Sequence, residues 1–149
     1  MKNVIIISVF FMFILSCIKK DECLVEQMIP YHFESDFGCD NTMRSLKIDL
    51  TNNCALIRTI EDYNNKVSGA CHPEINFSWF DLIIGRQSSD YLIDTILYDL
   101  KWSCPDNEYI LTVDMVKSAT VLQDTVVFHA IIPKIADWEG LKININVTK

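Results

Sequence analysis

Apolar and polar residues alternate along much of the chain, and this period of two predicts β-strands with one buried face. The alternation is clearest over residues 45–50, 98–103, 108–115 and 141–148. Two further segments, Asn76–Gly85 and Thr125–Ile132, are more continuously apolar. Such runs are typical of strands covered on both faces, so we expect Thr125–Ile132 and the second half of Asn76–Gly85 to be deeply buried.

Turn signals separate these segments. Thr51–Asn53 predicts a turn between the first alternating segment and a returning strand over Cys54–Arg58, which together form a hairpin. Cys104–Asn107 predicts a second hairpin turn. We expect Gly85 and Pro133 to end the strands that precede them.

One short helix is predicted over Ile60–Val67. Thr59 can cap its first amides and Asp62 can reach back, as in a capping box, while Ile60, Tyr63 and Val67 share one face. A short strand over residues 23–29 is expected to end before Pro30. Together these elements predict a mainly β (α+β) fold, an antiparallel sandwich or half-barrel of about seven to eight strands with one short helix.

The N-terminus has a different pattern. Lys2 precedes Val4–Leu15, an apolar run interrupted only by Ser8. At about 1.5 Å per residue this run covers roughly 18 Å, which is short of a bilayer core of about 30 Å. The length favours a secretory signal peptide over residues 1–16 rather than a spanning helix.

This segment ends in Ile14-Leu15-Ser16-Cys17, which resembles the lipobox of bacterial lipoproteins. In that family the Cys thiol receives a diacylglycerol, the signal is cut before it, and the new amino group is acylated. The resemblance implies that Cys17 is lipidated, and several acyl chains anchor a protein stably in a membrane. An ordinary signal peptide with a chance Cys is the alternative.

Residues 17–22 continue as Cys17-Ile18-Lys19-Lys20-Asp21-Glu22. A lysine followed by acidic residues resembles the export signal of surface lipoproteins in Bacteroidota-type bacteria, and Ile18 replaces the Asp that marks inner-membrane retention elsewhere. The resemblance implies an outer-membrane lipoprotein that faces outward on a charged tether. A plain solvated tether without an export role is the alternative.

Residues 23–149 have the size of one domain, with few Gly or Pro residues and no internal repeat. The chain carries a formal net charge of −7, and Lys2 is the only charged residue of the predicted signal. An acidic domain without a basic cluster argues against nucleic acid as a partner.

Five cysteines follow the predicted lipidation site: Cys23, Cys39, Cys54, Cys71 and Cys104. In an exported, oxidising setting we expect at most two disulfides and one leftover thiol. The sequence does not fix the pairing, although short loops favour Cys23–Cys39 and Cys54–Cys71. The spacings contain no C-x-x-C, so neither a zinc knuckle nor a thioredoxin-type motif is indicated.

Three histidines, His32, His72 and His129, are candidate bases. His129 lies within an apolar run, which favours a core or edge histidine over a catalyst. Cys71 and His72 are adjacent, and adjacent side chains on an extended chain point apart, so a disulfide is the expected fate of Cys71. No hydrolase, metalloprotease, P-loop or dinucleotide motif is present, and we expect no catalytic residue, metal ion or cofactor.

Two alternative functions depend on loop residues. A small envelope hydrolase would need two carboxylates of Asp36–Asp40 or Asp137–Glu139 to converge in a pocket. A glycan-binding domain would need exposed tryptophans. We expect Trp79 and Trp102 in the core, whereas Trp138 lies in a predicted loop and is the candidate interface residue.

Two tripeptides, Asp94-Thr95-Ile96 and Asp124-Thr125-Val126, resemble the O-glycosylation acceptor motif of Bacteroidota-type bacteria. The second is expected to be the more accessible because it begins a predicted strand.

The middle of the chain carries a broader resemblance. Its marks are Arg58–Tyr63, Ile75–Gly85 and Ala130–Lys134, which lie in the order expected for strand, helix and paired strands. The arrangement resembles small uncharacterised lipoproteins of Bacteroidota-type bacteria and, more distantly, the C-terminal domain of a lipoprotein that stabilises a surface protease complex. The resemblance implies a non-enzymatic binding or complex-stabilising module whose partners are the membrane and another envelope protein.

Overall fold

The computed structural model describes residues 26–104, 106–135 and 140–148. Strands dominate this part of the chain, which confirms the prediction of a mainly β fold. The elements in chain order are β1 (Glu26–Met28), α1 (Phe33–Phe37), α2 (Thr42–Ser45), β2 (Lys47–Ile48), β3 (Cys54–Ile57), α3 (Ile60–Lys66), β4 (Val67–Ser68), β5 (Phe80–Ser103), β6 (Glu108–Pro133) and β7 (Leu141–Thr148).

One five-stranded sheet forms the body, with the order β1-β5-β6-β7 and β3 paired to β5. A separate small sheet contains β2 and β4. The β6–β7 pair is parallel, from Tyr109–Leu141 to Val116–Thr148, whereas the other pairs are antiparallel. The expectation of an entirely antiparallel fold is therefore wrong, because β7 returns to the beginning of β6 instead of continuing as a hairpin from its end.

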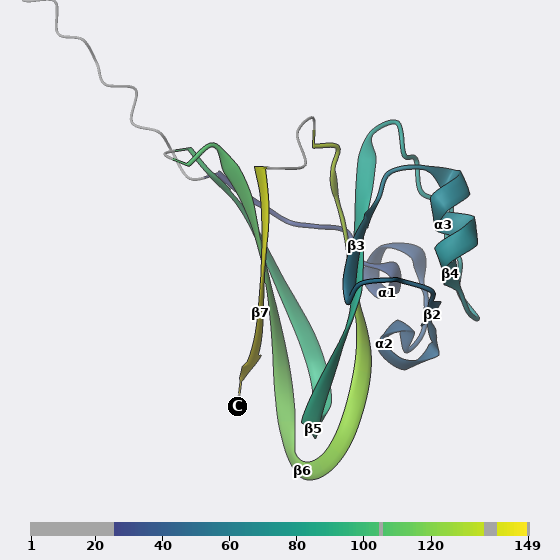
Figure 1. The fold of residues 1–149 in the computed structure, drawn as a ribbon, viewed down its shortest axis with the longest axis vertical. Helices are drawn as coiled ribbons and strands as arrows, with labels where there is room; N and C mark the ends of the chain where they lie inside the picture. Colours follow the sequence, from purple (N-terminus) through teal and green to yellow (C-terminus); the bar gives the residue numbers. More distant parts are fainter. Residues whose placement is uncertain (1–25, 105, 136–139, 149) are drawn as a thin grey trace, which may run out of the picture.

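The strands β5 and β6 form one long hairpin that bends in the middle. They pair from Phe80–Pro133 to Ser103–Glu108, with register shifts between Ser89 and Thr95. Such irregularities bend a strand and increase its twist. Figure 1 shows the two strands descending together, turning at the bottom and rising again, so the hairpin forms two limbs.

The two limbs differ in what covers them. Residues 80–89 and 124–133 form the doubly covered half, with the helices, β2 and β4 on its outer face (Figure 1). Residues 95–103 and 108–116 form the singly covered half, to which β1 and β7 add. The inner faces of both halves share the sheet-interior core, which comprises Ile83, Ile93, Leu100, Leu111, Val113, Met115, Val126, Phe128, Ala130, Ile132 and Ile135.

The helices and the outer face of the doubly covered half enclose a second apolar cluster, the helix-side core. It contains Phe33, Cys39, Leu46, Leu50, Ile57, Tyr63, Val67, Ile75, Leu82, Ile84, Val127 and Ile131. Tyr63 of α3 and Phe33 of α1 meet edge to face, with ring centroids 6.4 Å apart. The helical layer therefore packs on the sheet mainly through aromatic and branched side chains.

The hairpin corrects one expected strand end and confirms two. Gly85 does not end a strand but lies inside β5, opposite Phe128. A Cβ at this position would lie 2.4 Å from the Phe128 ring and 2.6 Å from the carbonyl oxygen of Asn53. Glycine is thus required for close approach rather than for a turn. Pro133 does end β6, and the hairpin turn between Ser103 and Glu108 is confirmed.

The predicted hairpin over residues 45–58 is wrong. Lys47–Ile48 pairs with Val67–Ser68, while Cys54–Ile57 pairs with residues 82–85 of β5. The alternating apolar residues of the first segment, such as Leu46 and Leu50, pack into the helix-side core instead of a sheet face. Periodicity predicted the extended conformation there but not its partner.

The predicted helix is confirmed as α3, and α1 and α2 are two further short helices. Its cap forms as expected, because the Asp62 amide donates to Thr59 Oγ1 at 3.1 Å. Tyr63 and Val67 are buried, whereas Ile60 is exposed. None of the helices in the described part of the chain has the length and hydropathy needed to cross a membrane.

Candidate functional site

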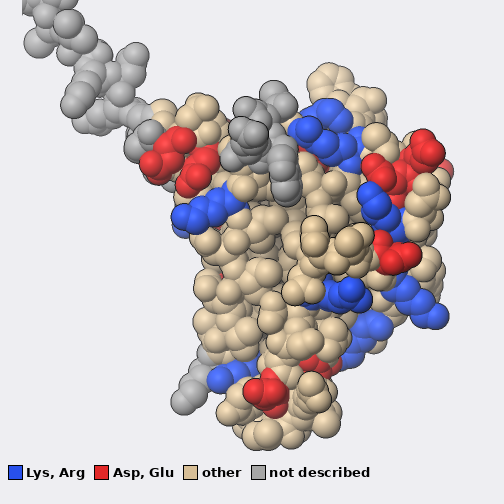
Figure 2. Space-filling view, in the orientation of Figure 1, with Lys and Arg blue, Asp and Glu red and all other residues tan. Residues whose placement is uncertain are grey.

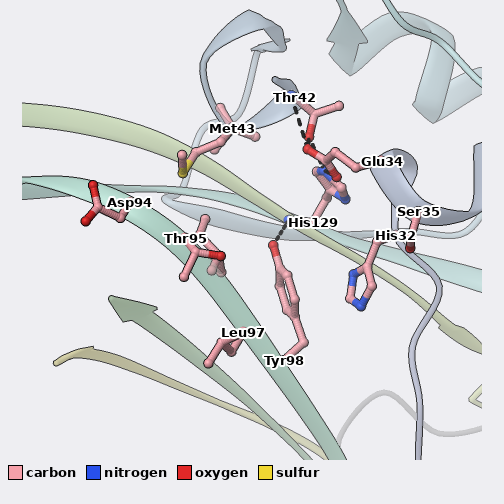
Figure 3. A pocket seen from close by; sticks show the side chains of 12 residues that line it. His32, Glu34, Ser35, Thr42, Met43, Asp94, Thr95, Leu97, Tyr98 and His129 are labelled. Atoms are coloured by element: carbon pink, nitrogen blue, oxygen red, sulfur yellow. Dashed lines mark hydrogen bonds and ion pairs between the residues drawn. The ribbon is translucent and has the colours of Figure 1, made fainter. Parts of the chain in front are cut away.

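A pocket of about 480 Å³ lies where the α1–α2 segment meets both limbs of the hairpin (Figure 3). Its lining combines polar and apolar side chains from four parts of the chain. The lining residues are His32, Glu34, Ser35, Thr42, Met43, Asp94, Thr95, Ile96, Leu97, Tyr98, Val127 and His129.

Three of these residues form a polar cluster in which Glu34 and Thr42 meet the imidazole of His129 (Figure 3). His129 Nε2 lies 2.6 Å from Thr42 Oγ1 and 3.3 Å from Glu34 Oε2. Glu34 Oε1 accepts from the Thr42 amide at 3.1 Å and also from the Thr42 hydroxyl. The Phe33 ring stacks on the imidazole at 4.3 Å.

The sequence position of His129 explains why the cluster forms. It lies in the doubly covered half and only 2% of its surface is exposed, which confirms the expectation of a core histidine. A buried polar side chain needs hydrogen-bond partners, and the α1–α2 segment supplies them from above the sheet. The cluster therefore attaches the helical layer to β6.

The ionisation states follow from this packing. Burial acts to raise the pKa of Glu34, but the hydrogen bonds and charge of His129 and the Thr42 amide outweigh it, so the pKa lies below its ordinary value. Burial, and then the charge of His129, lower the pKa of His32. At neutral pH Glu34 is ionised and His32 is neutral, so neither is suited to act as a general acid.

The geometry of the cluster differs from a catalytic relay. In such a relay the acid binds one imidazole nitrogen and the nucleophile binds the other. Here Glu34 and Thr42 approach the same nitrogen, and Thr42 is fully buried. Because the Thr42 hydroxyl donates to Glu34, Nε2 of His129 must carry the proton that Thr42 Oγ1 accepts. His129 therefore cannot take a proton from Thr42.

Tyr98 connects the pocket to the other limb. Its hydroxyl, from the singly covered half, accepts the main-chain N–H of His129 at 3.0 Å, and its ring packs against His32 at 4.7 Å. Burial raises the pKa of Tyr98, so the hydroxyl stays protonated. Nδ1 of His32 and Nδ1 of His129 are buried and find no hydrogen-bond partner among the described residues.

Among the described carboxylates of the predicted hydrolase, neither Asp36 nor Asp40 lines the pocket. Asp36 Oδ2 accepts from the His32 amide at 2.7 Å and the Ser35 hydroxyl at 2.8 Å, and these bonds lower its pKa. Asp40 is exposed, and Asp137–Glu139 lies outside the described residues. Figure 3 shows Asp94 on the opposite side of the pocket from Glu34. Within the described segments, no group of three or more His, Cys, Asp or Glu residues could hold a metal ion.

The cysteines pair differently from the expectation. Cys39 and Cys71 form a disulfide with Cα atoms 5.6 Å apart, so the predicted pairs Cys23–Cys39 and Cys54–Cys71 are both wrong. The helical layer folds back and joins cysteines distant in sequence, which a preference for short loops does not anticipate. Cys104 is also disulfide-bonded. Cys17 and Cys23 lie outside the described residues.

Cys54 is the free cysteine of the described part of the chain. Burial raises the pKa of its thiol to about 11. It is therefore protonated at neutral pH and is not a reactive nucleophile.

The two tryptophans expected in the core, Trp79 and Trp102, differ in burial. Trp79 is 71% exposed, so its predicted core position is wrong: it precedes β5 in a turn whose amides bond to Asn76. Trp102 is partly buried and packs against Tyr109, with ring centroids 4.6 Å apart. Trp138 lies outside the described residues.

The two candidate glycosylation threonines, Thr95 and Thr125, are both exposed. The aspartates that precede them differ in their contacts. Asp94 is exposed, whereas the Asp124 carboxylate accepts from the Arg44 guanidinium at 2.7 Å and from the Ile93 amide at 3.2 Å. The structure thus gives Thr125 no advantage in access over Thr95.

A second, apolar groove of about 310 Å³ lies beside the free edge of β6, where Tyr31 and Ile131 form an isolated bridge. It is lined by Tyr31, Phe37, Glu74, Ile75, Asn76, Phe80 and Ile131. Two of these lining residues, Tyr31 and Phe37, are exposed. Ile29, two residues before Tyr31 in the sequence, is 87% exposed. Exposed apolar side chains gathered in this way mark interaction surfaces.

Sequence reasoning identified His129 and His32 but missed Glu34, Thr42 and Tyr98. These partners lie on three separate segments, and no local motif joins them. The available signal was His129 itself, since a polar residue inside a doubly covered strand predicts that buried partners exist.

No family model matches the chain, and neither the curated proteins nor the solved structures contain a match to it. The resemblance to envelope lipoproteins therefore stays a prediction.

Proposed function

We propose that this chain is a lipid-anchored envelope protein, held at the outer membrane through Cys17, that binds or stabilises another envelope protein without catalysing a reaction. The observation that carries the proposal is the apolar groove lined by the exposed side chains of Tyr31 and Phe37. Among the described residues, Glu74 is the only charged residue that lines it, so an apolar segment with a nearby basic residue would complement it. We interpret the body as a half-barrel, because both limbs belong to one continuous sheet.

The polar pocket supports binding over catalysis. The ionised Glu34 and the protonated Nε2 of His129 both contact Thr42, and these contacts hold the α1–α2 segment on the sheet. Thr42 is inaccessible to a substrate. The cluster thus fixes the strand edge and loop that border the groove, which favours a rigid recognition surface.

The anchor is tested by feeding cells a palmitate analogue and measuring the intact mass of the purified protein. We expect label on a chain that begins at Cys17 and no label on Cys17→Ser. A mature chain that begins elsewhere, or a bare thiol at Cys17, would contradict the membrane part of the proposal.

The partner is tested by crosslinking in intact cells with two matched variants. Phe37→Ser removes an exposed apolar side chain of the groove, and Leu97→Ser removes one from the opposite limb. We expect one envelope protein to crosslink to the wild type and to Leu97→Ser but not to Phe37→Ser. Equal crosslinking by all three, or by none, would contradict a role for the groove.

A further inference from the structure

Three chain segments bring basic and aromatic side chains together at one end of the doubly covered half. Arg58 follows β3, Trp79 precedes β5 and Lys134 follows β6. The Lys134 amide donates to the Trp79 carbonyl at 2.9 Å, which extends the β5–β6 pairing by one step. Figure 2 shows basic side chains gathered at the upper end of this limb, in a chain whose net charge is −7.

We propose that this end of the sheet binds a carboxylated sugar, a site that goes beyond the function proposed above. The pocket there has a volume of about 740 Å³ and is lined by Arg58, Thr59, Ser78, Trp79, Pro133, Lys134 and Ile135. In this assignment the cations hold the carboxylate and Trp79 packs against the ring of the sugar.

A fully buried carboxylate, Asp81, holds the two cations in place. Its Oδ2 accepts from Arg58 Nε at 3.3 Å and from the Ile135 amide at 3.0 Å, and Lys134 Nζ lies 3.6 Å from Oδ1. Arg58 Nη2 also donates to the Ile135 carbonyl, and Lys134 Nζ donates to the Phe77 carbonyl at 2.6 Å. Both cations are thus fixed before a ligand arrives, which reduces the entropy lost on binding.

This arrangement exceeds what Asp81 requires. One cation is enough to pair with a buried carboxylate, so among the described residues that line the pocket the second cation leaves an excess positive charge. Arg58 uses Nε and Nη2 for its contacts. Its Nη1 has no hydrogen-bond partner among the described residues and can therefore donate to a ligand. A guanidinium and a nearby ammonium are the groups best suited to bind a carboxylate.

Trp79 indicates the rest of the ligand. Its indole is 71% exposed at the pocket, so its flat apolar face is available for a ligand to pack against. The axial C–H groups of a pyranose ring pack on an indole face, and Ser78 adds a hydroxyl for hydrogen bonding to the sugar. A ring that carries both a flat C–H face and a carboxylate satisfies the indole and the two cations together.

The test is titration calorimetry of the full chain in mild detergent with a trimer of galacturonic acid. We expect the acid to bind and its methyl ester, which lacks the charge, to bind at least about tenfold more weakly. Trp79→Ala and Lys134→Gln should each weaken binding about tenfold, whereas Lys134→Arg keeps the charge and should retain it. The matched controls Leu97→Ala and Lys142→Gln, at exposed positions elsewhere, should leave binding unchanged.

Circular dichroism and the denaturation midpoint establish that each variant is folded, and Lys134→Arg remains informative if Lys134→Gln is not. The proposal is overturned if the acid trimer does not bind at millimolar concentration, if its ester binds equally well, or if Trp79→Ala binds like the wild type. Poly-glutamate that binds as tightly as the trimer would also overturn it, because the site would then recognise an acidic peptide.

Discussion

The two limbs of the β5–β6 hairpin consist of the same two strands but are buried to different extents. In the doubly covered half, Leu82, Ile83 and Ile84 are consecutive and all fully buried, because alternate residues enter the helix-side core and the sheet-interior core. In the singly covered half, Leu100 is fully buried while its neighbour Lys101 is exposed. The helical layer, rather than the strands themselves, causes this difference.

The comparison explains where the candidate sites lie. The groove, the polar cluster and the Arg58–Trp79–Lys134 pocket all border the doubly covered half. A limb fixed on both faces cannot readily shift, so side chains at its ends and edges are held in defined positions. The singly covered half supplies Thr95, Ile96, Leu97 and Tyr98 to the polar pocket, and its inner face completes the sheet-interior core.

The largest expected effect comes from replacing adjacent residues in each half. Leu82→Ala and Ile83→Ala should each lower the free energy of unfolding by about 2–5 kcal/mol, because each leaves a cavity in a different core. Leu100→Ala should cost a similar amount, whereas Lys101→Ala should stay within about 0.5 kcal/mol. Chemical denaturation measures all four. A cost below about 1 kcal/mol for either Leu82→Ala or Ile83→Ala would mean that one face is not covered.

Removing the Cys39–Cys71 disulfide tests what holds the helical layer in place. The two cysteines are 32 residues apart, and closing a loop of that length stabilises the folded chain by about 3–4 kcal/mol in the chain-entropy model. The double variant Cys39→Ala, Cys71→Ala should therefore lose that much. Hydrogen exchange should quicken in α1–α3 before it does in β7. Uniform loss of protection over both limbs would indicate that the layer and the sheet unfold together.

Tyr98→Phe tests the link between the limbs. The change removes the acceptor of the His129 amide, which lies on the edge of β6 that β7 pairs with only near the start of the strand. Beside His129, the described pairing on this edge is the bridge between Tyr31 and Ile131. A buried amide without a partner costs about 1–3 kcal/mol, and exchange of the His129 amide should accelerate. Tyr109→Phe, a partly buried tyrosine in the same core, is the matched control and should cost less. Equal costs would remove the special role of Tyr98.

The same contrast shows how far the sequence predicts the fold. Alternation and continuous apolar runs predicted the two burial patterns correctly, and Thr59 and Asp62 predicted the cap of α3. The strand boundary predicted at Gly85 was wrong because glycine is required both by turns and by the close approach of Phe128, and the sequence does not distinguish the two. The continuity of β5 through its bend was missed because the period of two fails where the register shifts.

Long-range pairing lay beyond the sequence for a physical reason. The partner of Cys39 depends on how the helical layer folds back, whereas β7 and Ile57 find their partners on distant strands of the hairpin. Side-chain period says nothing about such distant neighbours. The candidate site was predicted to the same extent: His129 was recognised as buried, but Glu34 and Thr42 reach it through tertiary packing.

The smallest expected effect concerns Asp124, near the bend where the limbs meet. Burial opposes its ionisation, but the Ile93 amide and the Arg44 guanidinium outweigh it and hold the pKa below its ordinary value of 3.8. A lowered pKa contributes stability above about pH 4, and this stability is lost as pH falls through the folded-state value. Asp124→Asn should therefore cost about 1 kcal/mol at pH 7. The difference from the wild type should shrink below pH 4. Denaturation at pH 7 and pH 3 measures it, and a constant difference would show that Asp124 stabilises the bend by packing and neutral hydrogen bonds rather than by its charge.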